Sequence, residues 1–175
     1  MLFPRTLHDL RRFARDIGIA FVVSLFTLIF LFQPFKVEGT SMMPSLQDQE
    51  RILVNKLVYE VGAVQHGDLI VFHYPRDPSK TFIKRVIAGP GDTIVIRNGL
   101  VWLNGQRLEE SYRYHESVAH ESFGPATVPT DSYFVLGDHR SVSHDSRNWG
   151  LVPTDAIFGK AILRYWPPGQ FGPLG

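Results

Sequence analysis

The chain has 175 residues, with 18 Lys or Arg against 17 Asp or Glu, so its formal net charge is +1, and it contains no cysteine. This length fits one domain with an appendage, and a composition of 44% apolar and 20% charged residues excludes a disordered chain. The near-zero net charge argues against a nucleic-acid-binding protein. Because the chain has no thiol groups, disulfides and a cysteine nucleophile are also excluded.

The first predicted element is an apolar helix. Residues 17–35 are 19 consecutive residues without Asp, Glu, Lys or Arg, and a helix of that length is roughly 28 Å long, close to the ~30 Å hydrocarbon core of a bilayer. We therefore predict a transmembrane anchor, which Pro34 would end. A cleavable signal sequence and a buried core helix are the alternatives.

The charges before this segment predict its orientation. Arginines precede it, at positions 5, 11, 12 and 15. The positive-inside rule then places residues 1–16 in the cytoplasm as a short terminus. Residues 36–175 would form an extracytoplasmic domain, held at the cytoplasmic membrane by a single pass.

This extracytoplasmic part is predicted to be mainly β, because short runs rich in Val, Ile, Phe and Tyr alternate with Gly, Pro, Asn and Asp. The predicted strands are 51–54, 68–74, 81–87, 93–97, 100–103, 133–136 and 157–165. Asn98-Gly99 predicts a tight hairpin between two of them. Residues 105–130 are polar and are interpreted as an irregular excursion. Because long amphipathic helical patterns are lacking, a parallel α/β fold is disfavoured.

Two local clusters could supply a nucleophile and a base. Ser41 follows Gly39 and precedes Pro44, a pattern that is typical of an ordinary turn but also presents a hydroxyl group. In the strand 81–87, alternation places Lys84 on the same face as apolar side chains. Such a lysine either extends its ammonium group to water or is buried, which lowers its pKa until the neutral amine can accept a proton.

The third cluster is a polar loop, residues 137–150. It contains carboxylates and guanidinium groups that can hold one another through bidentate hydrogen bonds, at Asp138, Arg140, Asp145 and Arg147. The loop is either an ordinary solvated loop or a rigid support that orients catalytic groups.

In this order, the clusters resemble type I signal peptidases, the membrane-bound serine proteases that remove signal sequences from exported proteins. The matching segments are 41–46 (SMMPSL), 67–72 (GDLIVF), 84–92 (KRVIAGPGD) and 137–147 (GDHRSVSHDSR). The resemblance implies antiparallel β-sheets around a small coiled β-barrel, preceded by one transmembrane helix. It implies neither a metal ion nor a cofactor.

The resemblance also implies residue roles. Ser41 would be the nucleophile, Lys84 the general base, and Ser143 the hydroxyl that positions the lysine amine. The supporting residues would be Asp138, Asp145 and Arg147. The backbone N–H of Ser41 is assigned as the first oxyanion donor. Some family members carry a hydroxyl residue where this chain has Gly39, so the second donor is left open between a neighbouring N–H and Thr40. His139, at a position that is often Asn, receives no role.

The implied substrates are signal peptides of secretory preproteins, which end in small residues of the A-x-A type. The candidate substrate-binding residues are Gly39, Met42 and Met43. The two methionines either line the site, touch the lipid bilayer or pack within the loop. The expected partners are these peptides and lipid, without nucleic acid, and no oligomeric state is predicted.

Other functions fit less well. A Ser–His–Asp hydrolase would use His144 and Asp145, but the G-x-S-x-G pattern fails because Met43 occupies its last position. The histidine spacing does not give the H-E-x-x-H pattern of a zinc peptidase. A self-cleaving repressor would begin with a DNA-binding region instead of an apolar segment. The remaining alternative is a membrane-tethered β domain that binds extracytoplasmic peptides without cleaving them.

Overall fold

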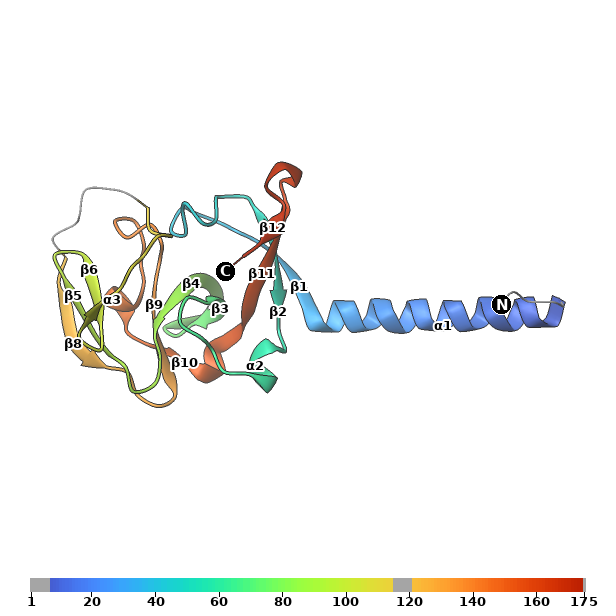
Figure 1. The fold of residues 1–175 in the computed structure, drawn as a ribbon, viewed down its shortest axis with the longest axis horizontal. Coiled ribbons are helices and arrows are strands. Elements are labelled where there is room, and N and C mark those ends of the chain that lie inside the picture. The colour runs from blue at the N-terminus through green and yellow to red at the C-terminus, as the bar shows by residue number, and fades with distance from the viewer. Residues whose placement is uncertain (1–6, 115–120, 175) are drawn as a thin grey trace. The chain divides into compact units, whose positions relative to one another are not determined.

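The structure is a computed structural model that describes residues 7–114 and 121–174. The chain divides into two units, Met1–Gln33 and Pro34–Gly175 (Figure 1). The helices are α1 (Leu7–Leu31), α2 (Val58–Val61) and α3 (Ser146–Trp149), with 3₁₀ turns η1 (Thr154–Ala156) and η2 (Pro168–Gln170). The strands are β1 (Phe32–Lys36), β2 (Arg51–Asn55), β3 (Leu69–Tyr74), β4 (Asp77–Ala88), β5 (Thr93–Arg97), β6 (Leu100–Leu103), β7 (Gln106–Arg107), β8 (Phe123–Thr127), β9 (Ser132–Leu136), β10 (Val152–Pro153), β11 (Ile157–Trp166) and β12 (Gly172–Pro173).

The apolar helix α1 begins and ends earlier than the sequence predicts. Within it, Asp9–Leu31 is long and apolar enough to cross a membrane, with a mean hydropathy of 2.0. Its large apolar side chains, such as Phe21 and Phe26, are exposed. The predicted end of this helix at residue 35 is wrong, because residues 32–35 belong to β1. Pro34 favours an extended backbone before it and is tolerated because β1 lies at a sheet edge.

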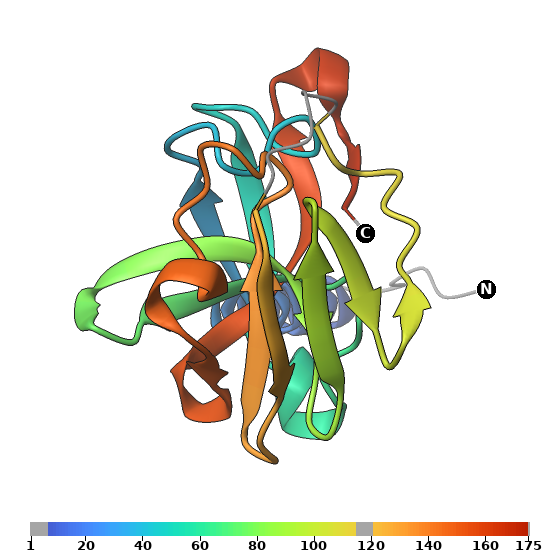
Figure 2. The same ribbon diagram turned by 90° about the vertical axis from the view of Figure 1, so that its left-hand side faces the viewer.

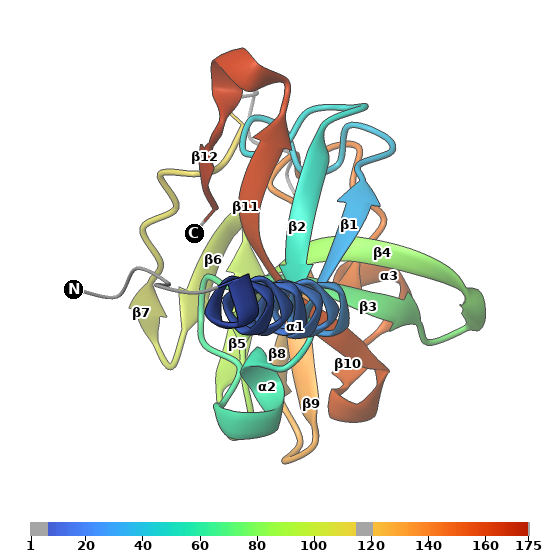
Figure 3. The ribbon, with the colours of Figure 1, turned by 90° about the vertical axis from the view of Figure 1, so that its right-hand side faces the viewer.

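The larger sheet has eight strands, in the order β1-β2-β11-β3-β4-β9-β10, with β12 paired to β11. The pairings of β11 with β2, β3 and β12 are antiparallel, as are those of β4 with β3 and β9. Figure 3 shows β11 with β2 on one side and β12 on the other. The predicted mainly antiparallel β fold is confirmed. Among the described residues the strand path runs open from β1 to β10, so hydrogen bonds do not close the expected barrel.

The second sheet has four strands in the order β7-β6-β5-β8; Figure 2 shows it with β7 in yellow at one edge. The hairpin of β5 and β6 turns at Asn98 and Gly99, both at positive φ, as predicted. The interpretation of residues 105–130 as wholly irregular is wrong, because β7 and β8 add to β6 and β5. Part of that stretch, residues 115–120, lies outside the described residues.

Three clusters of buried side chains fill the β unit. One lies under the loop that follows β1 and contains Met42, Leu46, Ile52, Val54, Leu69 and Val71. The other two contain Ile87 and Phe134 beside the second sheet and Phe72 and Trp149 beside α3. The long strand β4 contributes residues to both of these clusters. A side chain in the middle of β4 is therefore held by packing on both sides.

Candidate active site

Ser41 lies in a loop that buried side chains hold in place. The turn after it is closed by backbone hydrogen bonds from Met43 to Thr40 (3.2 Å) and from Leu46 to Met42 (2.9 Å). Before it, Gly39 has a φ of 91°, a conformation that favours glycine, and its N–H donates to Asp48 Oδ1 at 2.8 Å. Ser41 is thus presented on a fixed loop, with its side chain half-buried.

Lys84 reaches Ser41 from the middle of β4. Its Nζ lies 2.8 Å from Ser41 Oγ and 3.1 Å from the carbonyl oxygen of Ile83. The residue is only 5% exposed, and Nζ lies 5.6 Å from the centre of the Phe82 ring, on the face that strand alternation predicts. The extension of this ammonium into water, one of the two interpretations of the sequence, is therefore wrong.

The surroundings of Lys84 favour a neutral amine. Burial lowers the pKa of Lys84 from 10.5 to about 8, while the carboxylates of Asp145 and Asp138 oppose that change. Desolvation dominates because burial destabilises the charged ammonium group by more than the two carboxylates stabilise it. A substantial fraction of the amine is therefore unprotonated slightly above neutral pH, beside a hydroxyl group.

A cleft of about 370 Å³ opens beside these two groups. Its walls include Val37, Gly39, Ser41, Val71, Ile83 and Lys84. Gly39 is in the wall of the cleft, whereas the side chain of Met42 is buried in the first core cluster, which is the loop-packing alternative for this residue. Met43 is also not among the lining residues described for the cleft. Met42 anchors the loop in the core. The sequence pattern does not distinguish such an anchor from a substrate-binding residue.

The loop 137–147 packs directly against Ser41. The N–H of His139 donates to the carbonyl oxygen of Ser41 at 3.1 Å. A Cβ atom added at Gly137 would lie 2.2 Å from Ser143 Oγ and 2.5 Å from that same carbonyl oxygen, so only glycine allows the loop to approach this closely. Ser143 Oγ is buried, and among the described residues it has no hydrogen-bond partner. The predicted hydrogen bond from Ser143 to the lysine amine is therefore not formed in this structure.

Buried ion pairs at Asp138 and Asp145 help to hold this loop. Asp138 accepts two hydrogen bonds from Arg85, at 2.8 and 2.7 Å, and one from Ser45 Oγ at 2.5 Å. Asp145 accepts from Arg147, at 2.8 and 2.9 Å, and from the N–H of Gly137 at 3.1 Å. The sequence predicts the second pair. It misses the first, although an arginine on an apolar strand face indicates a buried carboxylate partner.

His144, the histidine of the rival Ser–His–Asp arrangement, is exposed at the rim of the cleft. Both oxygens of the adjacent Asp145 accept hydrogen bonds from Arg147, so this carboxylate supports the loop. The geometry around Ser41 thus favours the amine of Lys84 over the imidazole of His144.

Comparison with known proteins gives the family. The model of the family described as signal peptidase, peptidase S26, matches residues 10–166. The chain belongs to this family of signal peptidases. The peptidase is 38% identical over 179 residues to signal peptidase I of Leptolyngbya laminosa, covering 98% of this chain and 87% of that protein. It is 37% identical over 173 residues to signal peptidase I of Bacillus caldolyticus, covering 92% and 93%.

A solved structure gives the same result. The peptidase is similar to the crystal structure of a signal peptidase I from Enterococcus faecalis V583, with a TM-score of 0.51 and 32% sequence identity. The match covers 57% of this chain and 97% of that one. The resemblance inferred from the sequence motifs is therefore confirmed, and the chain is a peptidase of the signal peptidase I family.

Proposed function

We propose that this peptidase removes signal peptides from exported preproteins, with Ser41 as nucleophile and Lys84 as general base. The observation that carries this proposal is the 2.8 Å separation of Ser41 Oγ and Lys84 Nζ, with the amine buried. A general base must lie within hydrogen-bond reach of the proton it takes. A Ser–Lys pair is a known variant of triad logic.

The reaction follows from these positions. The neutral amine of Lys84 accepts the hydroxyl proton as Ser41 Oγ attacks the scissile carbonyl carbon, and the backbone N–H of Ser41 donates to the developing oxyanion. Lys84 then returns the proton to the leaving amine as the C–N bond breaks. Water hydrolyses the resulting ester by the same proton transfers, which releases the signal peptide and restores the hydroxyl group.

The cleft supports selection of small residues on the signal peptide. Its lining by Val37, Val71 and Ile83 gives apolar walls close to Ser41, which suit the alanines of an A-x-A sequence. We propose that the substrate lies extended there and pairs by its main chain, as in strand addition to a sheet edge.

The apolar helix supports a membrane location. We propose that α1 anchors the peptidase in the cytoplasmic membrane by one pass, with the amino terminus in the cytoplasm and the β unit on the extracytoplasmic side. The arginines before the apolar segment support this orientation. Substrates with a membrane-inserted signal sequence would then meet the site at the surface where they emerge.

Replacing Ser41 by alanine tests the function. The full chain in detergent micelles should cleave a preprotein with an A-x-A site, and Ser41→Ala should abolish cleavage because the attacking oxygen is removed. His144→Ala is the matched control on the rim of the same cleft and should cleave normally. Product formation is measured by mass spectrometry of the new amino terminus. If the wild type binds the preprotein without cutting it, the peptide-binding alternative is correct.

The pH dependence provides a second test. Because the base acts in its neutral form and burial lowers the pKa of Lys84 to about 8, kcat/KM should rise as pH increases through about 8. The measurement is initial cleavage rates between mildly acidic and alkaline pH, with folding checked at each pH. A rate that is highest in acid would contradict the assignment of the base.

A further inference from the structure

Residues 108–114, here called the brace, connect the second sheet to the loop 137–147, which packs against Ser41. The brace is tied to the second sheet by hydrogen bonds from the N–H of Leu108 to the carbonyl oxygen of Val101 (2.9 Å) and from Arg113 to that of Gly99 (2.8 Å). It belongs to the stretch for which the sequence predicts only an irregular excursion. Leu108 and Tyr112 also pack against the core cluster beside that sheet, and other contacts of the brace are with residues that surround Ser41 and Lys84.

The central contact of the brace is an ion pair between Glu110 and Arg140. Both side chains are only 6% exposed, and the guanidinium group binds both carboxylate oxygens. The Nε of Arg140 also donates to the carbonyl oxygen of Gly137 at 2.9 Å. Because Gly137 closely approaches the carbonyl oxygen of Ser41, one guanidinium group links the brace carboxylate to the backbone beside the nucleophile.

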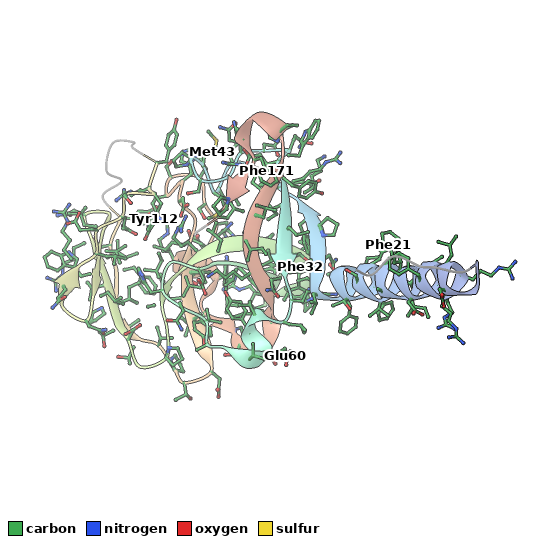
Figure 4. All side chains as sticks on the ribbon, turned by 45° about the vertical axis from the view of Figure 1, so that its right-hand side comes forward. Phe21, Phe32, Met43, Glu60, Tyr112 and Phe171 are labelled. Atoms are coloured by element: carbon green, nitrogen blue, oxygen red, sulfur yellow. The ribbon has the colours of Figure 1, made fainter. Side chains whose placement is uncertain are left out.

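A second line of contacts leads from the brace to β4. The Tyr112 hydroxyl donates to Glu110 at 3.1 Å, and the Tyr112 ring, labelled in Figure 4, lies 4.0 Å from the guanidinium carbon of Arg85. Arg85 follows Lys84 in β4 and binds Asp138. The brace therefore touches the supports of both reacting groups.

Tyr114 continues the brace along the loop. Its N–H donates to the carbonyl oxygen of Asp138 at 3.0 Å, and its ring lies 4.3 Å from that of His139. The N–H of His139 donates to the carbonyl oxygen of Ser41. Tyr114 is therefore also connected to the nucleophile, through His139.

We propose that the brace fixes the separation of Ser41 and Lys84, with Glu110 as a positioning residue that acts through Arg140 and Gly137. The inference rests on the proposed function, because the brace matters only if these two groups react. An arginine buried without its carboxylate is strongly disfavoured, so without Glu110 the guanidinium group would turn toward water and release Gly137. A displacement of about 1 Å at a reacting centre can lower a rate roughly 100-fold.

The test compares Glu110→Gln with Glu109→Gln in the full chain in detergent micelles. Glu109 precedes it in the chain and is exposed, so its variant should match the wild type. Glu110→Gln should lower kcat roughly 10- to 100-fold, because positioning affects the transition state, with KM unchanged because the brace does not line the cleft. Glu110→Asp, which keeps the charge, should recover part of kcat.

A double variant separates positioning from folding. Glu110→Leu with Arg140→Met replaces the ion pair by apolar side chains, a change that is often neutral or stabilising, but it removes the hydrogen bond to Gly137. Thermal unfolding should show a folded protein, and kcat should still be low. Wild-type kcat in Glu110→Gln or in the folded double variant would overturn the proposal. Cleavage by Ser41→Ala would instead overturn the proposed function.

Discussion

The Lys84→Met variant should fail to cleave a signal peptide and, at neutral pH, should be harder to unfold than the wild type. Methionine has a similar volume and no basic nitrogen, so the proton acceptor beside Ser41 Oγ is lost while the packing against Phe82 is kept. Preprotein cleavage and denaturant unfolding in detergent measure the two effects. Loss of activity together with a gain in stability would separate a catalytic role from a structural one.

The sign of the stability change follows from the pKa of the lysine. Burial lowers the pKa of Lys84 from 10.5 to about 8, so between these pH values the unfolded chain binds more protons than the folded one, and wild-type stability rises with pH. The advantage of Lys84→Met should be full below pH 8 and vanish above 10.5. Lys84→Arg should also be inactive, because a guanidinium group stays protonated. An active arginine variant would contradict the mechanism.

Replacing Asp138 by asparagine should cause the largest loss of stability, roughly 3–5 kcal/mol, because it leaves the buried Arg85 guanidinium group without its counter-charge. Both members of this pair are almost fully buried, and Asp138 also accepts a hydrogen bond from Ser45, four residues after the nucleophile. The measurement is the free energy of unfolding from urea titration, in detergent, of the wild type and the variant.

The matched control is the exposed pair of Asp77 and Lys80, whose side-chain atoms lie 3.0 Å apart on β4. Asp77→Asn should leave the unfolding curve almost unchanged, since water solvates both charges when they separate. Equal effects of the two substitutions would show that burial of the Arg85–Asp138 pair does not determine its contribution.

The strands were predictable wherever local pattern determines the structure. β5 and β6 have the predicted bounds, because Asn98-Gly99 specifies the turn between them. The proposed pair of Ser41 and Lys84 was predictable only from the four motifs in order, which resemble those of type I signal peptidases. Each residue alone also fits an ordinary turn or a surface lysine, and their contact joins segments 43 positions apart.

The remaining features depend on tertiary contacts that leave little trace in local sequence. The burial of Met42 depends on core residues from β2 and β3, and β1 forms because β2 offers it a pairing edge. In the sequence, the brace resembles an ordinary polar loop. Its charged and aromatic residues contact partners about 30 positions away, such as Arg140 for Glu110. Such pairs become visible only when the loop 137–147 is placed beside them.

The two reacting groups belong to elements of unequal rigidity. Lys84 lies inside a strand that is hydrogen-bonded to β3 and β9. Ser41 lies in a loop that is held by turn hydrogen bonds, by one hydrogen bond from His139 and by buried side chains such as Met42. Local opening is easiest where the backbone has few such partners. On heating, the serine loop should therefore loosen while the sheet is still intact, so that the peptidase loses its activity at a lower temperature than its fold.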